Sequence, residues 1–231
     1  MGMTAAGRRL KSSASSNPAK LRSRRRKRPA SLIVVYDRSV DADFAVELGA
    51  DDETLEMPWA AGEAGPSYCD LKRHPELLAK IREVDQVPEL GEFLLAVNSP
   101  SSPFETAKCD AWSTTEMKPE EEIFGAAYKF GSYVDILFSR EPHACSLPHY
   151  VQFATRLTQL LQKAPEIPAA AEFLIRRCHY HGETELRDGF YLTFYLFGFG
   201  EDEPQARQRW GIALKLVENA IRQASRTREP Q

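Results

Sequence analysis

The segment from Phe190 to Phe199 restricts the possible folds of this chain more than any other segment. Side chains alternate between the two faces of a β-strand. One face of this segment would carry aromatic residues and a threonine, and the other would carry Phe, Leu and Gly. Both faces are therefore apolar, which predicts a central strand covered on both sides. The chain has 231 residues, 42% of them hydrophobic, which is enough to build a core around such a strand.

The remaining patterns predict an α+β fold. β-branched or alternating runs indicate strands, and apolar residues at helical spacing indicate helices. The expected strands are residues 32–36, 44–48, 93–97, 104–115, 126–139, 173–181 and 190–199. The expected helices are residues 75–84, 148–163 and 201–224. We expect antiparallel sheet pairing with the helices packed on the sheet, the last of them as a C-terminal helix.

A weak internal repeat divides the chain into two halves. Residues 88–94 and 165–174 both contain Pro-Glu and an apolar residue, followed by Glu-Phe-Leu. Each match follows a predicted helix and opens a predicted hairpin, so two strand–helix–hairpin units are expected. We place the halves at residues 31–122 and 123–225, joined in one compact unit, with a frayed C-terminus at 226–231.

Charge is distributed unevenly along the chain. Residues 1–30 carry ten Lys or Arg and no Asp or Glu, whereas the other 201 residues carry 20 basic and 33 acidic groups, a net −13. Close like charges and little apolar surface predict a disordered basic tail. It would be a solubilising extension, an electrostatic arm for nucleic acid or an acidic partner, or an address. The arm would use the cluster Arg24, Arg25, Arg26, Lys27 and Arg28.

The sequence also restricts the expected compartment. No apolar run reaches the roughly 18 residues of a membrane helix, and no signal peptide is evident, so no membrane partner is expected. The four cysteines form no CxxC pair, which is typical of reduced thiols. We expect a cytoplasmic protein, or a nuclear or organellar one if the basic tail is an address in a eukaryote.

Two groups of residues are candidates for chemistry. His179 and His181 would share one strand face and could both reach a metal, although no third ligand with suitable spacing follows. Cys109, beside Asp110, would need an activating base from another segment to act as a nucleophile. No phosphate-binding glycine loop or other cofactor motif is present, so we expect no cofactor and assign no catalytic residue.

The richest constellation combines arginines with the aromatic residues of the last two strands. Its members are Arg176, Arg177, Tyr180, Tyr191 and Tyr195. An aromatic wall with an arginine suits a small molecule or a protein partner, including a second copy of the chain as a homodimer. The leading hypothesis is a non-catalytic binding protein with an aromatic-lined cleft. The alternatives are an enzyme using Cys109 or the histidine pair, and a nucleic-acid-associated protein acting through its tail.

Overall fold

The computed structural model describes residues 41–49, 54–61, 65–140, 142–181 and 185–226. The predicted strand at 32–36, the basic tail with Arg24–Arg28 and the last five residues lie outside these ranges. A six-stranded sheet has the order β1-β5-β6-β4-β3, and β2 also pairs with β5. The strands are β1 Asp41–Val46, β2 Leu55–Met57, β3 Phe104–Thr114, β4 Tyr128–Phe138, β5 Ala169–His181 and β6 Leu186–Gly200.

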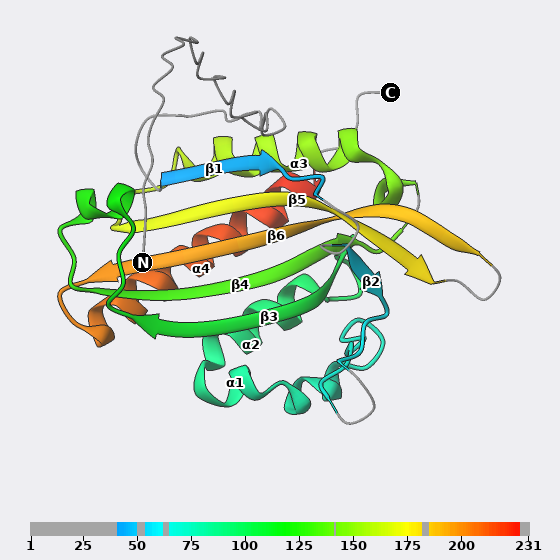
Figure 1. Ribbon diagram of the computed structural model, residues 1–231, viewed down its shortest axis with the longest axis horizontal. Coiled ribbons are helices and arrows are strands. Elements are labelled where there is room, and N and C mark those ends of the chain that lie inside the picture. Colours follow the sequence, from blue (N-terminus) through cyan, green and yellow to red (C-terminus); the bar gives the residue numbers. More distant parts are fainter. Residues whose placement is uncertain (1–40, 50–53, 62–64, 141, 182–184, 227–231) are drawn as a thin grey trace, which may run out of the picture. The chain divides into compact units, whose positions relative to one another are not determined.

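One layer of helices covers one face of this sheet and lies behind it in Figure 1. The helices are α1 Arg82–Gln86, α2 Pro88–Val97, α3 Leu147–Leu161 and α4 Glu203–Arg226, with short 3-10 helices at Pro75–Lys80, Pro119–Phe124 and His143–Cys145. α4 is central in the layer, because it contacts α2, α3, β4 and β6. Among the residues that the structure describes, no helix combines the length and apolar content needed to cross a membrane.

The α+β class is confirmed, but the expectation of a purely antiparallel sheet is wrong. β3–β4, β4–β6 and β5–β6 pair antiparallel, whereas β1 and β2 both run parallel to β5. An alternating pattern identifies a strand but carries no information about its direction. Parallel pairing requires a long connection, and β1 and β5 are separated by most of the described chain.

The predicted strand at Phe93–Val97 is also wrong, because these residues end helix α2. Pro88 occupies its first turn, a position that suits proline. Its buried positions follow helical spacing, at Leu90, Phe93, Leu94 and Val97. The matching Glu-Phe-Leu of the second half lies in β5, so the repeated positions differ in structure and the repeat is not confirmed. The predicted helix at 75–84 is interrupted at Ile81, between a 3-10 helix and α1.

The segment from Phe190 to Phe199 is a central strand, as predicted, within β6 between β5 and β4. Its helix-facing side packs into the main core, which includes Phe194 and Trp210. Trp210 Nε1 donates a hydrogen bond to Ser132 Oγ of β4 at 2.9 Å and so ties α4 to the sheet. A Cβ atom on Gly198 would lie 2.3 Å from the backbone nitrogen of Trp210, so only glycine lets α4 approach this closely.

Candidate functional site: the open face of the sheet

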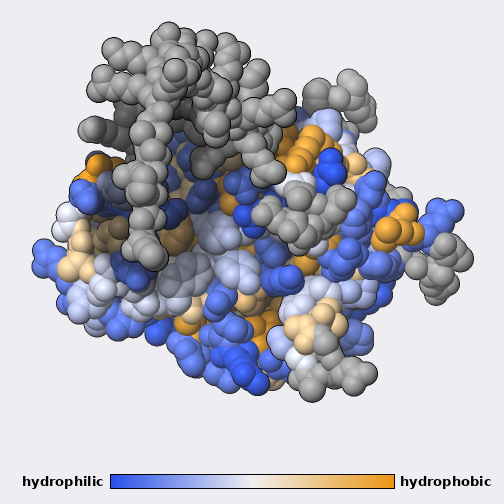
Figure 2. Space-filling view, in the orientation of Figure 1, coloured by the Kyte–Doolittle hydropathy of each residue, from blue (hydrophilic) through white to orange (hydrophobic). Residues whose placement is uncertain are grey.

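The face of the sheet opposite the helices, here called the open face, collects most of the functional candidates. It is turned toward the viewer in Figure 1, and Figure 2 shows hydrophobic colour scattered over it in small areas among hydrophilic ones. Two ends of this face are covered in the described part of the chain: at the β2 end Leu55, Met57 and Trp59 pack near Tyr191 in a small second core, and at the other end Phe124 stacks on Phe199. The rest of the described face mixes rings with charged side chains.

A hollow of about 670 Å³ lies on the open face. Its lining residues come from β3, β4, β5, β6 and the segment after β3: Trp112, Thr114, Glu116, Met117, Lys118, Lys129, Glu172, Leu174, Tyr195 and Phe197. Three rings form an aromatic wall. The Trp112 and Phe197 rings meet edge-on with their centroids 6.2 Å apart, and the Tyr195 and Phe197 rings stack at 6.4 Å.

Gly131 of β4 makes room for this wall. It is the cross-strand partner of both Trp112 and Phe197. A Cβ atom at this position would lie 2.9 Å from the indole ring of Trp112 and 3.1 Å from the Phe197 ring. The glycine therefore lets the Trp112 indole lie flat across β4 toward Phe197.

One cation is already held in the hollow by a carboxylate and a ring. Lys129 Nζ lies 2.6 Å and 2.9 Å from the two carboxylate oxygens of Glu121 and 5.2 Å from the centroid of the Phe197 ring. Both charged side chains are buried, with 7% and 8% of their surface exposed. Glu121 is therefore buried, although it belongs to a run of three acidic residues that would be expected to face solvent. A buried lysine partner so close in sequence was not evident from the pattern.

Two facing carboxylates lie at the hollow, one in its lining and one beside it. Asp43 of β1 and Glu172 of β5 are direct cross-strand partners on the open face. Burial raises the pKa of Asp43, and Asp41 raises it further. Burial also raises the pKa of Glu172, an effect that Lys118 and Arg176 oppose and that Asp43 and Glu47 increase. Like charges placed directly opposite on neighbouring strands repel each other, and the charges of Lys118 and Arg176 oppose this repulsion.

Another carboxylate is buried in the middle of the same face. Asp135 of β4 is 5% exposed and accepts a hydrogen bond from Thr193 Oγ1 at 2.7 Å. Burial raises its pKa to about 6, although the hydrogen bond from Thr193 and the charges of Lys108 and Arg176 lower it. The group therefore changes charge within the physiological range, in contrast to an ordinary aspartate.

The sequence-based ligand residues separate into two sets. Arg176, Tyr191 and Tyr195 lie together on the open face, as the cross-strand register and their mutual effects on pKa indicate. Arg176 also donates to Glu47 at 3.0 Å. Arg177 projects to the other side of β5, because neighbours on a strand alternate.

Tyr180 lies apart from the hollow. It packs in the second core beside Cys178, at the β2 end of the face. Burial raises its pKa far above the ordinary value. Its role there is packing under the β2 segment, so Tyr180 is not part of the aromatic wall.

Cys109 is half-buried on β3 and is not set up as a nucleophile. Burial raises the pKa of its thiol to about 12, with further contributions from Glu83 and Asp110. A thiol with this pKa is almost fully protonated at neutral pH, and the thiolate is the reactive form. Asp110 is exposed and accepts a hydrogen bond from the backbone nitrogen of Ala111 at 2.7 Å.

The two histidines of the metal hypothesis each contact a different carboxylate. His179 Nδ1 lies 2.9 Å from Asp188 Oδ1, and His181 Nε2 contacts Glu56 Oε2. Within the described ranges, no three His, Cys, Asp or Glu side chains are grouped so that they could hold a metal ion. The histidines lie at the far end of β5 from the aromatic wall.

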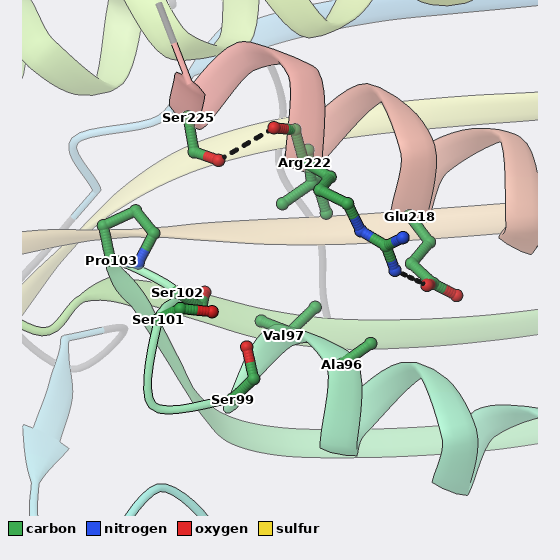
Figure 3. Close-up of a pocket in the computed structure, with 10 residues that line it drawn as sticks. Ala96, Val97, Ser99, Ser101, Ser102, Pro103, Glu218, Arg222 and Ser225 are labelled. Carbon is green, nitrogen blue, oxygen red and sulfur yellow. Dashed lines mark hydrogen bonds and ion pairs between the residues drawn. The ribbon is translucent and has the colours of Figure 1, made fainter.

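A second hollow, of about 490 Å³, lies between the end of α2, the following loop and the end of α4 (Figure 3). Its two charged lining residues, Glu218 and Arg222, contact each other. The loop is held by Lys72 Nζ, which donates to the backbone oxygens of Ser99, Ser102 and Phe104. The charge in this hollow is already compensated, so the open face is the stronger candidate for ligand binding.

Comparisons with protein-family models, with curated proteins and with solved structures gave no match for this chain.

Proposed function

We propose that this chain is a binding protein that takes a partner on the open face of its sheet, at the hollow walled by Trp112, Tyr195 and Phe197. One observation carries this proposal. The face combines partly exposed rings with a pair of facing carboxylates, next to a glycine that opens space for an indole. Concave sites with an apolar wall and a few polar groups are where proteins bind ligands.

Two further features support binding over catalysis. The thiol pKa of Cys109 opposes a nucleophilic role, and the two histidines point to separate carboxylates. The aromatic wall is also well suited to recognition, because tryptophan and tyrosine contribute a large contact area with few rotatable bonds.

A displayed library of random peptides, panned against the full chain, tests the proposal. Selected peptides should bind the wild type and lose affinity for Trp112→Ala and for Tyr195→Ala. Ile212→Ala is the matched control, because Ile212 is an exposed apolar residue on α4, in the helix layer. The proposal is wrong if no peptide is enriched, or if the enriched peptides bind all three variants as they bind the wild type.

A further inference from the structure

The hollow on the open face differs from a generic apolar pocket in its charge. Its lining includes Glu116 and Glu172, and Asp43 and Asp41 lie beside Glu172 on β1. Among the described basic side chains here, Lys129 is paired with Glu121 and Arg176 with Glu47, which leaves Lys118. Two of these four carboxylates line the hollow and two lie beside it, and they outnumber the basic side chains that are not already paired, so a cationic partner is favoured over an anionic one.

The geometry adds a second requirement. The rings of Trp112, Tyr195 and Phe197 present π-systems at the wall of the hollow. A cation over such a ring is attracted by its quadrupole, most strongly at tryptophan. Lys129 already provides an example of a cation that contacts both a ring and a carboxylate. Its ammonium group lies over the Phe197 ring and donates a hydrogen bond to Glu121.

We propose that the occupant of this hollow is an arginine-bearing basic peptide segment of a partner protein, an inference that rests on the proposed function. A guanidinium group would stack on the Trp112 ring and donate its paired N–H groups to Glu172, which lines the same hollow. Arginine fits better than lysine, because its planar group both stacks on rings and forms forked hydrogen bonds to carboxylates. The hollow of about 670 Å³ accommodates several residues of such a segment.

Binding of labelled synthetic peptides to the full chain at constant ionic strength tests this assignment. An arginine-rich peptide is compared with two others, in which every arginine is replaced by lysine or by glutamate. We expect the arginine peptide to bind best, the lysine peptide several-fold more weakly, and the glutamate peptide not at all. Trp112→Ala and Glu172→Gln should each weaken the arginine peptide by about tenfold.

Matched variants separate recognition from general charge attraction. Glu92→Gln makes the same charge change on α2, in the helix layer, where Glu92 pairs with Lys215, and it should leave binding unchanged. Trp112→Phe keeps a ring at the wall and should retain most of the affinity, even if Trp112→Ala impairs folding. Equal binding of the arginine and lysine peptides, together with equal losses in Glu92→Gln and Glu172→Gln, would overturn the assignment.

The outcome also distinguishes this inference from the proposed function. If the arginine peptide fails while library peptides of another chemistry require Trp112, the open face is a binding site and the arginine assignment is wrong. If neither the arginine peptide nor any library peptide depends on Trp112, both proposals are wrong.

Discussion

Aromatic rings lie on both faces of the sheet, but the side chains around them differ. On the helix-covered face, Phe194 is fully buried and stacks on Phe173 with ring centroids 5.5 Å apart. On the open face, the next residue, Tyr195, stays half-buried between charged neighbours. Aromatic content alone therefore does not identify a core. The rings of one face are surrounded by aliphatic side chains from α3 and α4. The rings of the other face are surrounded by charged side chains, among them Arg176 and Asp135.

The largest expected difference between the two faces is the loss of stability when neighbouring residues of β6 are truncated. Phe194→Ala should lower the free energy of unfolding by about 4 kcal/mol, because it leaves a cavity in the main core. Tyr195→Ala should cost about 1 kcal/mol, since part of its ring already contacts water. Chemical denaturation of both variants measures the difference. Equal losses would mean that the open face is covered as thoroughly as the other.

The buried carboxylate of the open face gives the next largest effect. The pKa of Asp135 is raised from 3.8 to about 6 in the folded chain. The folded state therefore holds this proton more tightly than the unfolded state, and stability falls as the pH rises through that interval. Asp135→Asn should remove about 3 kcal/mol of this pH dependence and should be more stable than wild type at pH 7.

The pH dependence is measured as the difference in unfolding free energy between wild type and Asp135→Asn across this pH range. The difference isolates one residue, because Asp43 and Glu172 titrate in both proteins. A difference that stays constant with pH would show that Asp135 is not shielded from water.

Two glycines, one facing the helices and one on the open face, allow the two faces to be compared by the same substitution. Gly198→Ala places a Cβ against the backbone of α4, which cannot move without shifting the helix, so we expect a loss of about 2 kcal/mol. Gly131→Ala meets only the side chains of Trp112 and Phe197, which can turn aside. Its cost should be smaller, and the tryptophan emission should change as the Trp112 ring moves. A larger cost at Gly131 than at Gly198 would contradict the account.

The smallest stability effect belongs to the pair of facing carboxylates. Glu172→Gln removes the repulsion from Asp43 across β1 and β5, so the chain should gain about 0.3 kcal/mol in unfolding free energy. The same change should weaken binding of a cationic peptide. Thermal denaturation and peptide titration on one sample measure both. A loss of stability would show that Glu172 contributes to the fold itself.

Much of the fold was accessible from the sequence because several elements carry strong periodic signals. β4, β6, α3 and α4 are long, and their apolar spacing identifies both their type and their approximate bounds. α2 was mistaken for a strand because its apolar run from Phe93 to Val97 is short, and such runs fit either structure. Pro88 and the spacing from Leu90 were the signals that would have corrected it.

The candidate site was only partly accessible. Arg176, Tyr191 and Tyr195 could be grouped because they belong to two adjacent strands. The Asp43–Glu172 pair and the contact of Trp112 with Phe197 depend on register between distant segments, which local patterns do not encode. The strand alternation also could not show which apolar face the helices would leave open, because both faces of β6 look alike in sequence.

One paired measurement on Tyr195→Ala tests the central claim, that the open face is a binding surface rather than a core. Arginine-peptide affinity and the free energy of unfolding are determined on the same preparation, with Phe194→Ala as the comparison. The account requires Tyr195→Ala to lose about tenfold in affinity while retaining most of its stability. Loss of stability comparable to that of Phe194→Ala, with affinity unchanged in whatever fraction remains folded, would contradict it.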